Sequence, residues 1–272
     1  MERYFSYPKE KLLEGRIPVR LLGSSEEVFG CLALDMADTI EENNRKGEET
    51  VFILPVGPVG QYPVFVRLVK ERELSLRACT FINMDEYLGR DDKWIDPSSK
   101  LSFRGFMERS VYSQIPSFLN VPAGQRIFPD PEDLGRVSEV IRQKGKVDIC
   151  FGGIGINGHL AFNEAEEVTA EEFAERTTRI VRMSRETRTA NAIGDLNGAI
   201  DAMPEKAVTV GMREILSARK VRLGVFRPWH RSVIRQALFS EPSGHFPVTL
   251  LQSHPDSLIY VNDIASEQAV EV

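Results

Sequence analysis

Val147 to Glu164 read V-D-I-C-F-G-G-I-G-I-N-G-H-L-A-F-N-E, and this stretch decides how the chain is interpreted. Its first five residues are apolar apart from Asp148, which predicts a strand buried on both faces of a parallel sheet. The three glycines that follow let the backbone turn sharply and approach a ligand closely. Polar side chains come next, at Asn157, His159 and Glu164. A solvated histidine in a structural turn is the alternative, but a histidine between glycines with Asn and Glu in reach favours a functional site.

Composition limits the class of protein. The chain has 272 residues, 42% of them hydrophobic and 27% charged, as in an ordinary globular protein with a substantial core. A net charge of −6 argues against a nucleic-acid partner. The sequence has neither an apolar run of membrane-spanning length nor the apolar segment of a signal peptide, and its three cysteines match no disulfide or metal pattern. We therefore expect a cytoplasmic protein with reduced thiols and no membrane partner.

The rest of the chain alternates predicted strands with predicted helices. We expect strands at 17–22, 51–54, 78–84, 147–151, 207–210, 221–226 and 257–261. We expect helices at about 25–44, 64–73, 101–115, within 129–144, and at 166–176, 184–193 and 230–239. This alternation predicts an α/β fold with a mainly parallel sheet and helices on both faces. No linker or repeat interrupts it, so we expect one domain over 1–272, with 1–16 as a polar N-terminal extension.

Candidate chemistry follows three of the predicted strands. The first group is the loop after Leu54, the second is Asp85 with Glu86, and the third is the segment from Asn157 to Glu164. Ligands of open α/β sheets bind outside the carboxyl ends of the strands. We therefore expect the three groups to surround one cleft.

Several motifs resemble those of glucosamine-6-phosphate deaminases. They are N-M-D-E-Y-L-G at 83–89, G-G-I-G-I-N-G-H-L-A-F-N-E at 152–164, T-R-T-A-N at 187–191, A-V-T-V-G at 207–211 and L-Q-S-H-P at 251–255. The resemblance runs in the expected order over nearly the whole chain from about residue 17. The G-H-x-A-F-N-E pattern separates this group from the sister 6-phosphogluconolactonases. The implied fold is a modified Rossmann-like, doubly wound α/β sandwich.

The resemblance implies an aldose–ketose isomerase and deaminase of amino sugar catabolism. Such an enzyme converts glucosamine 6-phosphate, or a close relative, to fructose 6-phosphate and ammonia without a metal or a cofactor. Asp85 matches the base that abstracts the C2 proton, His159 the acid/base for ring opening, and Glu164 the carboxylate that orients the histidine. Glu86 is expected to point away from the site, because successive residues of an extended chain face opposite sides. Homo-oligomer formation is left open by the sequence.

One departure from the family lies next to the histidine. The family has aspartate immediately before G-H, whereas this chain has Asn157. Asparagine is neutral and cannot stabilise the imidazolium electrostatically, although it can still form hydrogen bonds. We expect the orientation of the His159 ring to survive while its basicity falls.

A second departure concerns phosphate binding. The family carries a glycine pair followed by threonine, whereas this chain reads V-G-P-V-G-Q-Y at 56–62, with Gly57, Gly60 and Gln61 as candidate ligands. Pro58 removes one N–H group from this loop. The phosphate lysine of the family aligns with Arg231, and Arg188 of T-R-T-A-N matches a family arginine. We expect Arg188 and Arg231 to bracket a phosphate near the loop.

Three functional readings follow from these matches and departures. The first is an active deaminase or isomerase on a hexosamine phosphate or a near relative. The second is a sugar-phosphate-binding protein on the same fold with weak or no turnover. The third is a lactone hydrolase of the sister group, which the G-H-L-A-F-N-E match disfavours. We rank the first reading highest because Asp85, His159, Glu164 and Arg188 are all retained.

Overall fold

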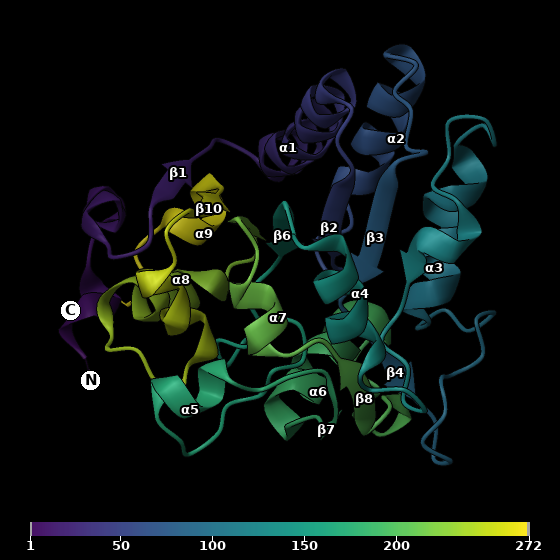
Figure 1. The fold of residues 1–272 in the computed structure, drawn as a ribbon. Helices are drawn as coiled ribbons and strands as arrows, with labels where there is room; N and C mark the ends of the chain where they lie inside the picture. The colour runs from purple at the N-terminus through teal and green to yellow at the C-terminus, as the bar shows by residue number, and fades with distance from the viewer. Residues whose placement is uncertain (1, 271–272) are drawn as a thin grey trace.

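The computed structural model describes residues 2–270, which form two β-sheets with helices packed around them (Figure 1). The larger sheet has seven strands in the order β1-β10-β9-β6-β2-β3-β5, and each neighbouring pair is parallel. Its strands are β1 (Val19–Leu21), β2 (Thr50–Leu54), β3 (Cys79–Asn83), β5 (Arg126–Ile127), β6 (Ile149–Gly152), β9 (Lys220–Val225) and β10 (Ser257–Val261). The predicted α/β fold with a mainly parallel sheet is confirmed.

A second, smaller sheet was not predicted. It has three antiparallel strands in the order β4-β8-β7, at the bottom of the view in Figure 1. They are β4 (Asp85–Leu88), β8 (Lys206–Thr209) and β7 (Arg179–Arg182). The sequence interpretation had placed Asp85 to Tyr87 in a turn after β3. Instead, only Met84 separates β3 from β4, and the chain passes directly from one sheet into the other.

Helices cover both faces of the large sheet. One face packs against α1 (Ser25–Lys46), α2 (Gln61–Glu71) and α3 (Phe103–Ser110). The other packs against α4 (Arg136–Lys144), α5 (Ala170–Ala174), α7 (Met212–Leu216), α8 (His230–Phe239) and α9 (Asp263–Ser266). The remaining α-helix, α6 (Arg185–Asp195), lies near the small sheet in Figure 1. No helix within residues 2–270 is long and apolar enough to cross a membrane.

The longest helix begins where its sequence predicts. The Ser24 hydroxyl accepts a hydrogen bond from the Glu27 N–H at 3.2 Å, which satisfies one of the unpaired amides of the first turn of α1. Gly47 ends the helix in a left-handed conformation with φ of 70°. Two predicted helices are shorter than expected. The one predicted at 101–115 ends at Ser110, and the one predicted at 166–176 is reduced to α5.

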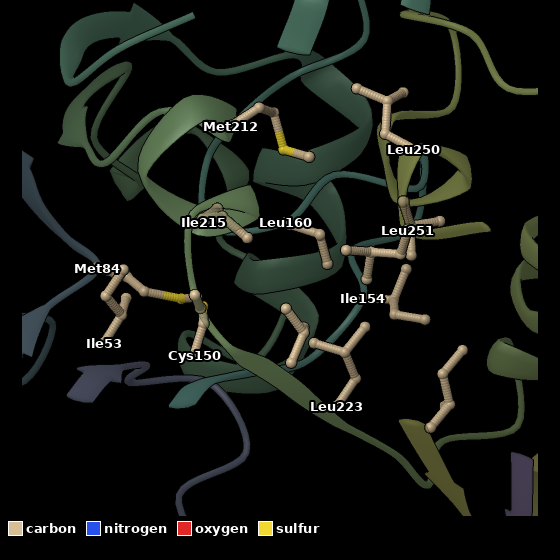
Figure 2. Packing of buried hydrophobic residues seen from close by; sticks show 14 of the residues in the cluster. Ile53, Met84, Cys150, Ile154, Leu160, Met212, Ile215, Leu223, Leu250 and Leu251 are labelled. Atoms are coloured by element: carbon tan, nitrogen blue, oxygen red, sulfur yellow. The ribbon is translucent and has the colours of Figure 1, made fainter. Parts of the chain in front are cut away.

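The core of the large sheet follows the alternation of its strands. On β2, Phe52 faces α1 and α2 and packs against Phe81 and Phe151, while Ile53 points to the opposite face. Figure 2 shows the second face, where Ile53, Met84 and Cys150 lie near Leu160, Ile154 and Leu223. Burial of each such side chain stabilises the fold by about 1.5–3 kcal/mol. This packing holds the carboxyl ends of β2, β6 and β9 together, and the loops that leave these ends meet at one edge of the sheet.

Candidate active site

A cavity of about 150 Å³ lies at the carboxyl edge of the large sheet. Its walls come from the loop after β2, the glycine loop after β6 and the segment between β9 and α8. The start of β4 contributes Asp85, and the glycine loop contributes His159. The cavity therefore brings together two candidate catalytic residues that are 74 positions apart in the sequence.

Asp85 is held by the small sheet. As the first residue of β4 it pairs with Thr209 of β8, and it is only 7% exposed. Burial raises the pKa of the Asp85 carboxyl well above its ordinary value, and the nearby Glu86 raises it further. A carboxylate whose pKa moves towards neutrality is suited to take and return a proton at physiological pH.

Glu86 points away from the cavity, as predicted. Its carboxylate accepts hydrogen bonds from the Ser102 hydroxyl at 2.8 Å and from the N–H groups of Phe103 and Arg104 at 3.0 and 2.9 Å. These N–H groups belong to the first turn of α3, where a negative charge is favourable. Glu86 therefore anchors a helix, and Asp85 is the carboxylate of this pair that lines the cavity.

The His159 ring is held by a chain of two side chains. Its Nδ1 lies 2.6 Å from Oδ1 of Asn157, and Nδ2 of Asn157 donates to Oε2 of Glu164 at 2.6 Å. Glu164 also accepts from the Ser184 N–H at 3.2 Å. The sequence interpretation had Glu164 orienting the ring. In the structure Asn157 holds the ring and Glu164 holds Asn157, and neither of the two lines the cavity.

This chain of contacts determines the tautomer of His159. Because the Asn157 amide nitrogen donates to Glu164, its oxygen faces the imidazole and can only accept. Nδ1 of His159 is therefore protonated, and Nε2 is left as the ring nitrogen that can accept a proton from a ligand. Burial lowers the pKa of His159, and the charge of Glu164 partly offsets this effect. The resting ring is neutral and can act as a base.

Gly155 allows the imidazole to occupy its position. A Cβ at this glycine would lie 2.0 Å from Cε1 and 2.1 Å from Nε2 of His159, closer than atoms can approach. Gly158 has φ of 78°, and a Cβ there would meet the ring of Phe246 at 2.6 Å. At both positions the residue must be glycine, because any side chain would collide with a neighbouring ring.

β8 joins the two halves of the site. Thr209, the partner of Asp85, accepts a hydrogen bond at its hydroxyl from the Phe162 N–H at 3.0 Å. Next to it, the backbone oxygen of Val210 accepts from Nδ2 of Asn163 at 2.9 Å. The segment that carries His159 is therefore tied to the strand that pairs with Asp85. The A-V-T-V-G motif at 207–211 has this structural role.

The predicted phosphate loop reaches the cavity only in part. Gly57 lines the cavity, but Gly60 and Gln61 do not. A Cβ at Gly60 would meet the ring of Phe29 at 2.3 Å, so this glycine faces α1. Gln61 is completely buried at the start of α2.

Neither predicted phosphate arginine lines the cavity. Nη2 of Arg188 donates to the backbone oxygens of Ile200 and Met203, at 3.1 and 3.3 Å. Arg231 donates through Nε to the backbone oxygen of Ile264 at 2.9 Å and forms an ion pair with Glu267. The expected arrangement, with Arg188 and Arg231 on either side of a ligand near Gly57, is therefore absent from residues 2–270 of this structure. Arg231 aligns with the family lysine, but in this chain it fastens α8 to the C-terminal segment.

Sequence reasoning missed four polar residues of the cavity wall. They are Tyr87, Asn191, Arg227 and His230. The first two lie within motifs that were recognised, and Nδ2 of Asn191 donates to the Tyr87 hydroxyl at 3.0 Å. The other two lie within R-P-W-H-R at 227–231, where the alignment had drawn attention to Arg231 instead.

Comparison with known proteins agrees with this architecture. No protein-family model matches the chain. A glucosamine-6-phosphate deaminase from Bacillus velezensis is 32% identical over 235 residues, which cover 85% of this chain and 92% of that protein. Among solved structures, a monomeric glucosamine-6-phosphate deaminase superposes with a TM-score of 0.79 at 27% identity, covering 91% of this chain and 98% of the other. A 6-phosphogluconolactonase from Shewanella baltica, with a TM-score of 0.62 at 14% identity and coverage of 90% and 97%, shares the fold.

Proposed function

The chain belongs to the glucosamine-6-phosphate deaminase family, and we propose that it converts an amino sugar phosphate to a ketose phosphate and ammonia. The observation that carries this proposal is the placement of Asp85 and His159 in the wall of one cavity. The substrate named for the relatives, glucosamine 6-phosphate, is the first compound to test.

The first step is the opening of the sugar ring. Nε2 of His159 accepts the proton of the anomeric hydroxyl while the bond between C1 and the ring oxygen breaks. The same nitrogen then returns the proton to the ring oxygen, which leaves an open-chain aldehyde. The neutral ring with hydrogen on Nδ1 supports this assignment, since it leaves Nε2 free to act as a base. Asn157 and Glu164 are positioning residues that keep this tautomer in place.

The second step moves a proton from C2 to C1. Asp85 takes the C2 proton while the aldehyde oxygen takes a proton from solvent water, which gives an enolamine. Return of the proton from Asp85 to C1, with loss of one N–H proton to solvent, converts the enolamine to a ketimine. The raised pKa of Asp85 supports this role, because a more basic carboxylate removes a proton from carbon more readily. Addition of one water molecule to the ketimine then releases ammonia and leaves the ketone.

The proposal also covers the setting of the reaction. We place the protein in the cytoplasm, acting on a small sugar phosphate with no nucleic-acid partner, in line with its net charge of −6. We also propose that the chain works as one domain, since β4 follows β3 after a single residue and the site draws on both sheets.

Product analysis tests the proposal. Purified protein supplied with glucosamine 6-phosphate should release ammonia and form fructose 6-phosphate in equal amounts, and Asp85→Asn should abolish both. Saturable binding of glucosamine 6-phosphate without product would show that the second reading, a binding protein, is correct. Ammonia release that persists unchanged in Asp85→Asn would refute the role of this carboxylate.

A further inference from the structure

The part of the cavity wall that comes from the loop after β2 offers few hydrogen-bond donors. The loop after β2 presents Pro55, Val56, Gly57 and Pro58, and the two prolines have no N–H group. A buried anion needs several donors or a positive charge to replace its water shell. This loop alone does not meet that need.

Two backbone donors of the segment between β9 and α8 are already used. The N–H groups of Phe226 and Arg227 both donate to Nδ1 of His230, at 3.2 and 2.9 Å. Nε2 of His230 must therefore carry the hydrogen, and it lies 3.0 Å from the backbone oxygen of Ile154. Burial holds the pKa of His230 at about 3, so this ring is neutral at physiological pH. Both of its nitrogens are thus occupied, and His230 supplies no charge to a ligand.

One positive charge remains in the wall. Among the described residues that line the cavity, Arg227 carries the only permanent cation. Its guanidinium lies 5.9 Å from the ring of Phe226 and makes no hydrogen bond or ion pair within residues 2–270. By contrast, Nη2 of Arg188 donates to two backbone oxygens. Arg231 donates to the backbone oxygen of Ile264 and forms an ion pair with Glu267.

We propose that Arg227 is the residue that binds the anionic group of the substrate. This inference rests on the proposed function and identifies how that site distinguishes a phosphorylated sugar from a free one. The planar guanidinium can donate two parallel hydrogen bonds to a phosphate. It would therefore supply the donors that the loop after β2 does not provide. The aromatic rings of Phe226 and Trp229, which line the cavity beside it, limit competition from water.

The test compares two arginines of one segment. Wild-type protein, Arg227→Gln and the matched control Arg231→Gln are assayed with glucosamine 6-phosphate and with glucosamine. Loss of a charged hydrogen-bond donor should reduce the preference for the phosphorylated sugar by about 10- to 100-fold in Arg227→Gln, mainly through a higher KM. Arg231→Gln should keep the wild-type preference. Arg227→Lys should recover part of it, because lysine retains the charge but not the paired geometry.

Three outcomes overturn the inference. The first is that Arg227→Gln retains the full preference for glucosamine 6-phosphate over glucosamine. The second is that Arg231→Gln loses this preference, and the third is that the wild type turns over glucosamine as well as its phosphate. If the wild type turns over neither sugar, the proposed reaction fails, and the inference is then judged by calorimetry with fructose 6-phosphate and fructose. In that experiment Arg227→Gln should weaken binding of the phosphate alone, and equal binding by the variant and the wild type would refute the role of Arg227.

Discussion

Replacement of Asn157 by aspartate tests how the protein controls its histidine. In the structure the Glu164 charge acts on His159 from beyond the Asn157 amide. Asn157→Asp would place a second carboxylate 2.6 Å from Oε2 of Glu164, where two like charges cannot both persist. One proton should therefore be shared by the pair. The net charge stays the same, but the negative charge moves next to the imidazole.

The size of the effect follows from this movement. With an effective dielectric constant of ~20, opposite charges ~4 Å apart attract by about 4 kcal/mol, and at ~7 Å by about 2.4 kcal/mol. The difference of ~1.6 kcal/mol corresponds to just over one pKa unit. We therefore expect Asn157→Asp to raise the pKa of His159 by about one unit. If His159 acts in ring opening, the pH optimum of the reaction should move upwards with it.

Two measurements check this prediction. The chain has four histidines, so an NMR titration of ¹⁵N-labelled imidazoles can follow each ring, and assignment is completed with a variant that lacks His159. The pH–rate profile of ammonia release gives the kinetic counterpart. A pKa of His159 that is unchanged or lower in Asn157→Asp would refute the proposed transfer of charge. A shifted pKa with an unmoved pH–rate profile would remove His159 from the steps that limit the rate.

The remaining predictions concern other parts of the same site. Gly155→Ala should reduce kcat by about 100-fold, because the added methyl group would occupy the position of the His159 ring and a displacement of ~1 Å can cost that much. As a control, Gly124→Ala should retain the wild-type kcat, because its methyl group would meet no atom within 4 Å. Equal values of kcat in the two variants would contradict the proposed contact at Gly155. Asp85→Asn should abolish turnover but raise Tm at pH 7. Burial raises the pKa of Asp85 in the folded protein, so the folded state loses stability as the pH rises from about 4, the ordinary pKa of aspartate, through the folded-state pKa. An unchanged Tm would contradict this cost of the buried charge. Glu164→Gln should lower the pKa of His159 in the NMR titration, since the Glu164 charge now raises it, and an increase would contradict this assignment.

The sequence was sufficient for six of the seven strands of the large sheet, and it selected Asp85 and His159, which line the same cavity. It missed β5, which is only two residues long. Apolar strands separated by amphipathic helices repeat with a period that a single sequence reveals, and the helix predicted at about 25–44 corresponds to α1 (Ser25–Lys46). The small sheet was missed because Asp85 to Leu88 and Arg179 to Arg182 are short segments rich in charged residues. β4 pairs with residues of β8 that lie more than 100 positions further along the chain, a separation that no local pattern encodes.

The sequence predicted the positions of the candidate phosphate-binding residues less well than those of Asp85 and His159. Asp85 lies two positions beyond the end of β3, and His159 lies in the loop that leaves the end of β6, so topology brings both to one edge of the sheet. The direction in which an arginine side chain points depends instead on the partners available to it. Arg231 turns towards Glu267 of the C-terminal segment, and this leaves Arg227 as the arginine in the cavity wall. Alignment to a family lysine selects the position but cannot detect that competing ion pair.

The fate of the hydrogen on C2 tests the central claim most directly. Glucosamine 6-phosphate carrying deuterium at C2 is incubated with the protein in ordinary water, and the hexose phosphate product is analysed by NMR. We predict that the deuterium leaves C2 in step with ammonia release, appears at C1 or in the solvent, and stays in place when Asp85 is replaced by asparagine. Release of ammonia with the deuterium still on C2 would contradict the proposed proton transfer.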